Sequence, residues 1–393
     1  MTRVLVIGSL AVSLLNFRGR LLRALVDAGY EVEACAPDHD NEVVRSLAAM
    51  GVSFRRIPMA RTGLNPVADV RTLIALYRAM FEWRPDIVLA YTQKPIVYAG
   101  IATRLVGHAR FFAMVSGLGH AFSEGGSRLR PLLARMVALL FRSSLKHAAA
   151  VFVFNADDRG ELLRHRMITE RHQVLQLPGS GIDLDRFAQQ PLPSGPPVFL
   201  MIARLLGCKG LEEFLAAARI VRARYPEARF RLLGPIDANP DSISRAALSR
   251  LEDESVITYL GETRDVRPFL ADATVFVLPS WYREGLPRTI LEAMATGRAV
   301  ITTDMPGCRD PITDGVNGIV VPPRDAEALA RACRSFLDDP ALADRMGAAA
   351  RRIAEDHYAV ERVNAQILHA IDPLRANSSA IVSTESSFVE LAA

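Results

Sequence analysis

The chain has 393 residues, half of them hydrophobic and 23% charged, and this length and composition suit two or three folded domains and exclude a wholly disordered chain. No run of about 18 apolar residues occurs and the start lacks the pattern of a signal peptide, so we predict a cytoplasmic protein without a transmembrane helix. The formal net charge is +4, and the four cysteines stand far apart without a C-x-x-C pair, which argues against a disulfide framework and a zinc site.

In the first half of the chain, short apolar runs alternate with helical stretches, which is the pattern of parallel β-α-β units. A helix is predicted from Phe17 to Ala28, because the following Gly29 is a typical helix terminator. Strands are predicted over residues 4–9, 31–37, 86–90, 111–115 and 150–154. These elements predict one doubly wound domain over residues 1–185.

A stretch rich in proline, glycine and serine, residues 189–197, is interpreted as a linker, and the D-L-D sequence at 183–185 as part of the same junction rather than a metal site. The α/β pattern then restarts, with strands predicted over residues 198–203, 230–234, 256–260, 274–279, 299–303 and 318–321. We therefore predict a second doubly wound domain over 186–357, a last helix within 358–372 and a frayed tail over 373–393. Two facing sheets of this kind place a ligand cleft between the carboxyl ends of their strands.

The most informative segment is PSWYREGLPRTILEAMATG, residues 279–297. A strand ends at its first residue, a loop follows, and Pro287 suits the first turn of a helix, where its missing N–H costs nothing. The N–H groups of Arg288 and Thr289 are then expected to be unpaired and to point into the cleft. The start of a helix attracts anions, so this segment predicts an anion site.

Two glutamates eight residues apart, Glu284 and Glu292, give this segment an E-x7-E pattern, and Arg204 with Lys209 gives an upstream R-x4-K-G pattern. Together they resemble the donor site of the retaining family 4 glycosyltransferases, which have the GT-B fold of two Rossmann-like domains. The resemblance covers about residues 1–372. Segments 13–19, 91–95 and 116–122 are similar to the bacterial subgroup that extends polyprenyl-diphosphate-linked sugars in polysaccharide and glycan assembly.

The resemblance implies a nucleotide-sugar donor, with UDP as the expected nucleotide, and neither a metal nor a further cofactor. Arg204 and Lys209 are expected to neutralise the diphosphate leaving group, one as a planar fork and the other as a mobile point charge. By resemblance Glu284 contacts the donor sugar, Glu292 holds the ribose hydroxyls, and the base rests near residues 259–262. The expected donor site further includes Gly8, Ser9, Gly285, Leu286, Arg288 and Thr289. The structural alternative is that these charges are solvated on the surface, and it applies to Arg204, Lys209, Glu284 and Glu292.

The first domain supplies further candidates. The resemblance implies that His120, in a glycine-rich loop after a strand, lies near the donor sugar as a second catalytic candidate beside Glu284. Arg18 and Lys94 are candidates for binding the acceptor diphosphate. Their structural alternatives are a plain loop histidine and solvated cations. Ser9 stands where many relatives have a second glycine, and a structural turn is the alternative there.

Residues 45–150 hold 15 Lys and Arg against 4 Asp and Glu, which favours an anionic partner such as lipid headgroups or a phosphorylated substrate. No basic-aromatic pattern occurs, so nucleic acid is not predicted as a partner. On a helical wheel a basic stripe spans about 40°. The stripe is Arg128, Arg135, Arg142 and Lys146, bordered by Leu132 and Leu139, and the predicted core face is Leu129, Leu133, Met136 and Leu140. Such a stripe suits docking on an anionic membrane surface, with a solvated charged face as the alternative.

We therefore expect a two-domain GT-B enzyme, peripheral on the inner face of the cytoplasmic membrane. The first domain is expected to bind a polyprenyl-diphosphate sugar and the second a UDP-sugar, with front-side attack that retains the anomeric configuration. As in relatives, the last helix is expected to cross back onto the first domain. The alternatives are a nucleotide-sugar 2-epimerase of the same fold, a catalytically silent nucleotide-sugar sensor and a bilobal solute-binding protein. The missing signal peptide and the phosphate-directed Arg204 and Lys209 disfavour the last.

Overall fold

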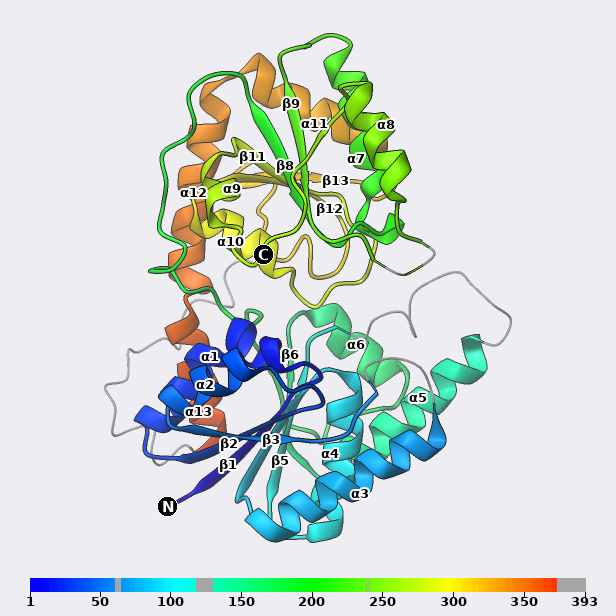
Figure 1. Ribbon diagram of the computed structural model, residues 1–393, viewed down its shortest axis with the longest axis vertical. Helices are drawn as coiled ribbons and strands as arrows, with labels where there is room; N and C mark the ends of the chain where they lie inside the picture. Colours follow the sequence, from blue (N-terminus) through cyan, green and yellow to red (C-terminus); the bar gives the residue numbers. More distant parts are fainter. Residues whose placement is uncertain (61–64, 118–129, 238, 240, 373–393) are drawn as a thin grey trace.

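The computed structural model describes residues 1–60, 65–117, 130–237, 239 and 241–372, which form two lobes stacked along the long axis of the molecule (Figure 1). Each lobe is built on one sheet whose paired strands all run parallel, with helices on both faces. The predicted fold class, two doubly wound sheets, is confirmed. Within the described residues, no helix combines the length and the apolar character that a membrane crossing requires.

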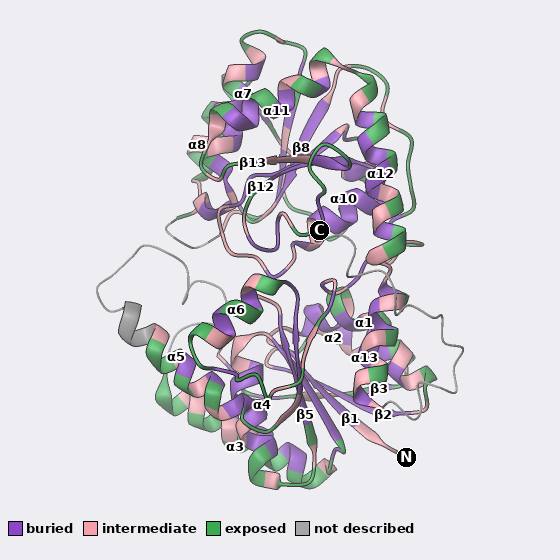
Figure 2. Cartoon of the chain, turned by 180° about the vertical axis from the view of Figure 1, so that it is seen from behind, coloured by how far each residue is buried: buried purple, intermediate pink, exposed green. Residues whose placement is uncertain are grey.

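The sheet of the first lobe contains β1 (Arg3–Ile7), β2 (Glu31–Ala36), β3 (Val52–Arg56), β4 (Ile87–Tyr91), β5 (Arg110–Val115), β6 (Ala148–Val153) and β7 (Val174–Gln176), in the order β3-β2-β1-β4-β5-β6-β7. Its helices are α1 (Ala11–Asp27), α2 (Asn41–Ala49), α3 (Pro66–Trp83), α4 (Gln93–Val106), α5 (Arg130–Leu145) and α6 (Ala156–Arg164). Alternate strand residues face opposite sides. Leu5 and Ile7 share a core with α3, α4 and α5, whereas Val4 and Val6 share one with α1 and α2. Both faces are therefore buried, as Figure 2 shows.

The sheet of the second lobe contains β8 (Val198–Ile202), β9 (Arg229–Leu233), β10 (Thr258–Tyr259), β11 (Val275–Leu278), β12 (Ala299–Thr303) and β13 (Gly318–Val321), in the order β10-β9-β8-β11-β12-β13. A single 3-10 turn, η2 (Gly207–Lys209), precedes α7 (Leu211–Arg222), α8 (Arg245–Asp253), α9 (Arg267–Ala271), α10 (Arg288–Ala295), α11 (Ala326–Asp338) and α12 (Ala341–His357). In both sheets the strand order reverses beside the first strand, which places ligands at the neighbouring carboxyl ends.

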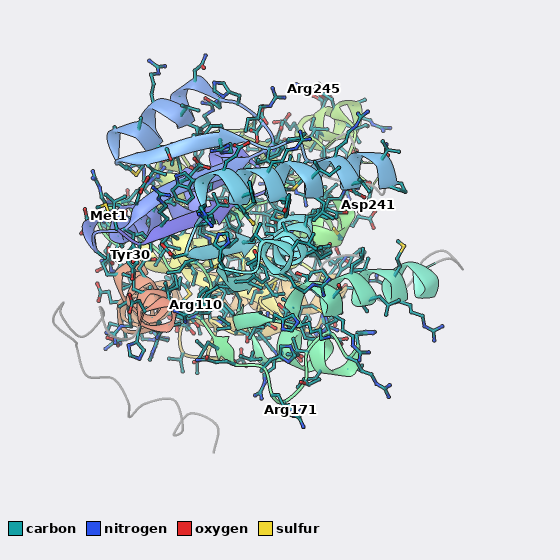
Figure 3. The ribbon with its side chains drawn as sticks, turned by 90° about the horizontal axis from the view of Figure 1, so that it is seen from below. Met1, Tyr30, Arg110, Arg171, Asp241 and Arg245 are labelled. Carbon is teal, nitrogen blue, oxygen red and sulfur yellow. The ribbon has the colours of Figure 1, made fainter. Side chains whose placement is uncertain are left out.

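The last helix, α13 (Val360–Ile371), belongs to the core of the first lobe although it follows the second lobe in sequence. Its Val363, Ile367 and Ile371 pack with residues of α1 and β1. At its end, Arg110 donates to the Ile371 carbonyl at 2.8 Å, and Tyr30 donates to the carboxylate of Asp372 at 3.3 Å. Figure 3 shows Tyr30 and Arg110 beside this helix.

The chain crosses between the lobes twice, and the two crossings lie side by side. The N–H of Ile182 donates to the Tyr358 carbonyl at 2.7 Å, and the N–H of Val360 donates back to the Ile182 carbonyl at 2.9 Å. The D-L-D sequence lies at this junction, where Arg20 of α1 contacts Asp183 at 2.7 Å and Asp185 at 3.3 Å. These aspartates therefore fix the junction to α1.

The observed local structure differs from the predicted one in several elements. Helix α1 begins at Ala11 rather than Phe17, because its first N–H is capped at 2.7 Å by the carboxylate of Asp38, which lies far along the chain. Strands β3 and β7 were not predicted, since only Val52 is buried in β3 and no residue is buried in β7. Met136 was assigned to the core face of its helix, but its side chain is 41% exposed.

Candidate active site

An ion pair between Lys209 and Glu284 lies at the carboxyl end of the second sheet. The Glu284 carboxylate accepts hydrogen bonds from the Lys209 ammonium and, at 3.2 Å, from the Ser280 hydroxyl. Both charged side chains are 14% exposed. The ammonium also lies 5.2 Å from the centre of the Tyr282 ring, a cation–π contact. The R-x4-K-G and E-x7-E patterns therefore meet at one largely buried pair of charges.

Gly210 explains how the lysine reaches this position. Its φ is +78°, in the left-handed region that glycine tolerates best. A Cβ at this residue would also collide with the backbone carbonyl of Pro279, at the end of β11. The glycine of the R-x4-K-G pattern thus lets the loop after β8 lie directly against the loop that carries Glu284.

Arg204 does not join this ion pair. Its guanidinium contacts Asp237, in the loop after β9, with Nη1 and Oδ2 3.1 Å apart, and its side chain remains 51% exposed. Tyr259, at the end of β10, donates to the Gly234 carbonyl at 3.0 Å, which holds the segment predicted for the base against the same loop. Arg204 therefore lies at the carboxyl edge of the sheet with about half of its side chain exposed to solvent.

Pro287 was predicted in the first turn of a helix, but it has an extended ψ of 117° and serves as the N-cap of α10, which begins at Arg288. The carbonyl of Pro287 accepts the N–H of Ile290 at 3.1 Å, so the N–H groups of Arg288 and Thr289 come first at the helix start. The Arg288 guanidinium contacts the Glu292 carboxylate at 3.0 Å. Burial raises the pKa of Glu292, and the neighbouring Arg288 opposes this shift.

Arg288 also reaches the first lobe. Its Nη1 donates to the backbone carbonyl of Asn16 in α1, and its guanidinium lies 5.4 Å from the centre of the Phe17 ring. Leu286, two residues earlier in the chain, packs against the cores of both lobes. The start of α10 is therefore held between the two sheets.

The two lobes meet in a contact between backbones next to Glu284. A Cβ on Gly285 would lie 2.5 Å from the carbonyl carbon and oxygen of Ser116 and 2.8 Å from the N of Gly117. Gly117 has a φ of +103°. Asn155, fully buried at the end of β6, donates to the carbonyl of Gly285 at 2.7 Å and to that of Glu284 at 3.3 Å. The loop that carries the central glutamate is thus positioned by the first lobe.

Charged groups flank this contact from both lobes. Arg283 contacts Glu161 of α6 at 3.1 Å, and Arg309 contacts Asp157 at 2.7 Å. Asp158 is 1% exposed and accepts from Asn155 at 3.1 Å. Burial raises the pKa of Asp158 from 3.8 to about 7, while the bond from Asn155 and the charge of Arg283 lower it.

The raised pKa of Asp158 gives a prediction for stability. The folded protein holds this proton more tightly than the unfolded chain, so its contribution to the free energy of unfolding is largest below pH 4 and declines between about pH 4 and about pH 7. The decline is at most about 1.4 kcal/mol for each pH unit. Between pH 4 and pH 7, the free energy of unfolding measured with urea should fall more, or rise less, for the native protein than for Asp158→Asn. The exposed Asp253→Asn is the control, and identical slopes for all three proteins would contradict the prediction.

In the first lobe, the candidate residues gather around Tyr91 at the end of β4. A Cβ on Gly8 would collide with the Tyr91 hydroxyl, which explains the glycine after β1. The same hydroxyl and that of Ser13 in α1 are 2.8 Å apart and share a hydrogen bond. Ser9 follows in the loop between β1 and α1. This loop therefore lies at the carboxyl edge of the first sheet, and its expected contact with the donor stays a prediction.

Arg18 is buried, with 3% of its surface exposed, and makes no ion pair in the described structure. Its guanidinium lies 5.0 Å from the centre of the Tyr91 ring, and its Nε has no hydrogen-bond partner. Burial lowers the pKa of Arg18 to about 10, although Tyr91 opposes this. The hydroxyl of Thr92 is likewise buried without a partner, and its φ of +68° is unusual for a threonine.

The remaining candidates of the first lobe are Lys94 and His120. Lys94, at the start of α4, makes an ion pair with Asp69 of α3 at 2.9 Å, and both side chains are largely buried. The structure therefore gives Lys94 a partner inside the first lobe. His120 lies outside the described residues, as do Arg128, Leu129 and the tail. Asn155 and Thr92 were not among the predicted site residues. The N-cap role of Asn155 is a local signal, but its bonds to the carbonyls of Glu284 and Gly285 join segments far apart in the chain. A positive φ at Thr92 has no sequence signal, because it occurs at a residue other than glycine.

Comparisons with known proteins agree with this architecture. Residues 17–178 match the model of the glycosyl transferase 4-like domain, and residues 184–353 match that of the glycosyl transferases group 1. Over 343 residues the chain is 27% identical to the N,N'-diacetylbacillosaminyl-diphospho-undecaprenol alpha-1,3-N-acetylgalactosaminyltransferase of Campylobacter jejuni, covering 84% of this chain and 88% of the relative.

Solved structures show the same fold. Sucrose-phosphate synthase from Thermosynechococcus elongatus superposes with a TM-score of 0.78 at 20% identity, covering 96% of this chain and 100% of the other. Anabaena HepE in complex with UDP-glucose gives a TM-score of 0.75 at 17% identity, covering 95% and 100%. With both domain models matched in order across the two lobes, the chain belongs to the family 4 glycosyltransferases of the GT-B fold and is an enzyme of that kind.

Proposed function

We propose that the enzyme transfers a sugar from a UDP-sugar to a polyprenyl-diphosphate-linked sugar, with retention of the anomeric configuration. The observation that carries this proposal is the ion pair between Lys209 of η2 and Glu284 of the loop before α10. A cation for the departing diphosphate and a carboxylate for the sugar stand side by side there, next to the N–H groups of a helix start. The name of the Campylobacter relative supports the acceptor class, and the UDP-glucose complex of HepE supports the nucleotide.

In the proposed reaction, the bond between C1 of the sugar and the diphosphate oxygen breaks, and its electron pair stays on that oxygen. Lys209, with Arg204 nearby at the same sheet edge, compensates the new negative charge, so no metal is required. The acceptor hydroxyl attacks C1 on the same face and passes its proton to the departing phosphate oxygen. Glu284 stabilises the positive charge that develops at C1.

Glu292 is proposed to hold the ribose hydroxyls. Its carboxylate is buried against Arg288, which itself bonds to the first lobe. One oxygen of the Glu292 carboxylate accepts from the Arg288 guanidinium. The carboxylate can still accept hydrogen bonds from two neighbouring hydroxyls, because its two oxygens offer about four acceptor positions. The segment at 259–262 is proposed to contact the base.

For the acceptor diphosphate, we propose a site beside Tyr91. Arg18 supplies a buried guanidinium without an acidic partner, and Thr92 supplies an unpaired hydroxyl. Both would gain from an anion, because a buried unpaired polar group costs free energy. Lys94 is proposed to contribute by exchanging Asp69 for the diphosphate. The acceptor is lipid-linked, so we also propose that the enzyme works peripherally on the inner face of the cytoplasmic membrane.

Transfer of a radiolabelled sugar from UDP-sugars to a bacterial lipid extract tests the proposal. We expect label in the lipid phase that mild acid releases, as expected for an allylic diphosphate. Turnover of the UDP-sugar without any acceptor would instead support a 2-epimerase. Stabilisation of the protein by UDP-sugars in a thermal-shift assay without turnover would support a silent sensor. Both of these results contradict the proposed transfer.

A further inference from the structure

Helix α3 exposes a continuous row of large apolar side chains. Spaced alternately three and four residues apart, they are Val67, Val70, Ile74, Tyr77 and Phe81, with exposed fractions of 62%, 54%, 46%, 36% and 66%. At 3.6 residues per turn they fall within about 80° of one another on the helix. The rings of Tyr77 and Phe81 stack with their centres 6.1 Å apart. The opposite side of the helix, with Leu76 and Met80, packs into the core of the first lobe. The side chains of the exposed row are therefore not part of this core.

Exposed apolar side chains also occur on the neighbouring helices. Helix α4 packs against both α3 and α5, and the three form one layer on the same face of the first sheet (Figure 1). Leu105 of α4 is 58% exposed, and Met136 and Leu139 of α5 are 41% and 60% exposed. Eight of the eleven exposed large hydrophobic residues in the described structure belong to this layer. We call it the α3–α5 face. Such a concentration is typical of an interaction surface.

The charges on the α3–α5 face are almost all of one sign. Among the described side chains of the three helices and the residue after each, the exposed basic residues are Arg71, Arg78, Arg84, Arg104, Arg135, Arg142 and Lys146. Glu82 is the exposed acid in that set, and it contacts Arg55 at 3.0 Å. Arg71 and Arg78 lie within about 40° of the apolar row of α3. In its described part, the α3–α5 face therefore carries seven exposed cations and one exposed acid, Glu82, which contacts Arg55.

We propose that the α3–α5 face docks on the surface of an anionic lipid bilayer, with the apolar row of α3 entering the region between headgroups and acyl chains. Basic residues around an apolar stripe are the combination that interfacial binding requires. A second copy of this chain is the other occupant that a row with this spacing fits. In such a dimer the cations of the two faces would lie opposite one another, with few acidic residues to pair with them. Charge therefore favours the bilayer as the occupant. The inference deepens the proposed function, because it assigns the membrane contact to particular helices.

Two double variants separate the apolar and the electrostatic contributions. Ile74→Ser with Phe81→Ser removes apolar area, and Arg71→Glu with Arg78→Glu reverses charge. All four side chains are exposed, so the fold should tolerate both changes. Matched controls on the second lobe are the exposed Val316→Ser and the exposed pair Arg331→Glu with Arg352→Glu.

The measurement is co-sedimentation with vesicles of phosphatidylcholine, with and without phosphatidylglycerol, in the absence of donor and acceptor. We expect the native protein and both controls to bind the vesicles that contain phosphatidylglycerol. The apolar variant should bind about tenfold more weakly. The charge variant should bind at least about 30-fold more weakly, because loss of each basic residue costs roughly fivefold and the introduced glutamates add repulsion. Native-like binding by both double variants would overturn the proposal.

Two further measurements distinguish the remaining outcomes. Sedimentation velocity without lipid should give a monomer; a dimer that Phe81→Ser dissociates would overturn the proposal in favour of a second copy. Transfer to an acceptor dissolved in detergent should proceed at native rates in both double variants, since no vesicle surface is involved. Loss of vesicle binding with intact transfer in detergent supports the docking surface, whereas absent transfer by the native protein in detergent would count against the proposed function alone.

Discussion

Replacement of Lys209 by methionine is expected to reduce sugar transfer by a factor of about 100 to 1,000, the usual loss when one preorganised electrostatic contact to a transition state is removed. Methionine keeps the length of the side chain and removes its charge. Without the ammonium, the Glu284 carboxylate is left largely buried beside the departing diphosphate, so both stability and rate should fall. Single-turnover transfer of radiolabelled sugar measures the rate, and calorimetric titration with UDP measures donor binding.

The partner variants separate a catalytic role from a structural one. Glu284→Gln should likewise reduce transfer, because the carboxylate that faces C1 is lost. In the double variant Lys209→Met with Glu284→Gln no unpaired charge remains, so thermal stability should return toward the native value while transfer stays lost. Transfer that recovered together with stability would mean that the pair serves the fold only. The exposed Glu212→Gln in α7 is the control for a change of charge near the same loop.

The sequence predicted those parts of the fold that depend on local pattern. Buried parallel strands are continuous apolar runs in the sequence. This pattern alone located five strands of the first lobe, which are β1, β2, β4, β5 and β6. Strands β12 and β13 were predicted at their observed bounds, and helix α13 lies within the predicted range of 358–372. Strand β3 could not be found in this way, because polar residues alternate with its apolar ones and most of the strand is not buried.

The candidate site was predictable where its residues stand in a spaced pattern. The contact of Arg288 with Glu292 follows from four-residue spacing on a helix and was available from the sequence. The meeting of Lys209 with Glu284 was suggested only through the resemblance to a family. The partner of Lys94, the burial of Arg18 and the bond from Asn155 to the Glu284 loop join segments far apart in the chain. No local pattern encodes such contacts, since they arise from how the sheets and helices pack.

Substitution of Gly285 by alanine is expected to reduce transfer at least about 100-fold while leaving each lobe folded. The added Cβ would lie 2.5 Å from the backbone of Ser116 and 2.8 Å from that of Gly117. Backbone atoms cannot rotate away as side chains do, so the lobes have to separate or the loop has to shift. A displacement of about 1 Å at reacting groups is enough for a loss of this size. Glu284 is the adjacent residue, so the displacement acts directly on the ion pair.

Gly160→Ala is the matched control, because no atom lies within 4 Å of a Cβ at that helical position in the first lobe. It should transfer sugar at the native rate and be more stable by up to about 1 kcal/mol, since alanine favours a helix over glycine. Small-angle scattering should show a larger radius of gyration for Gly285→Ala and an unchanged one for Gly160→Ala. Native rates in both variants would show that the backbone contact between the lobes is not part of the reactive arrangement. The geometry argues otherwise, because the same loop is bonded by Asn155 from the first lobe and pairs with Lys209 of the second.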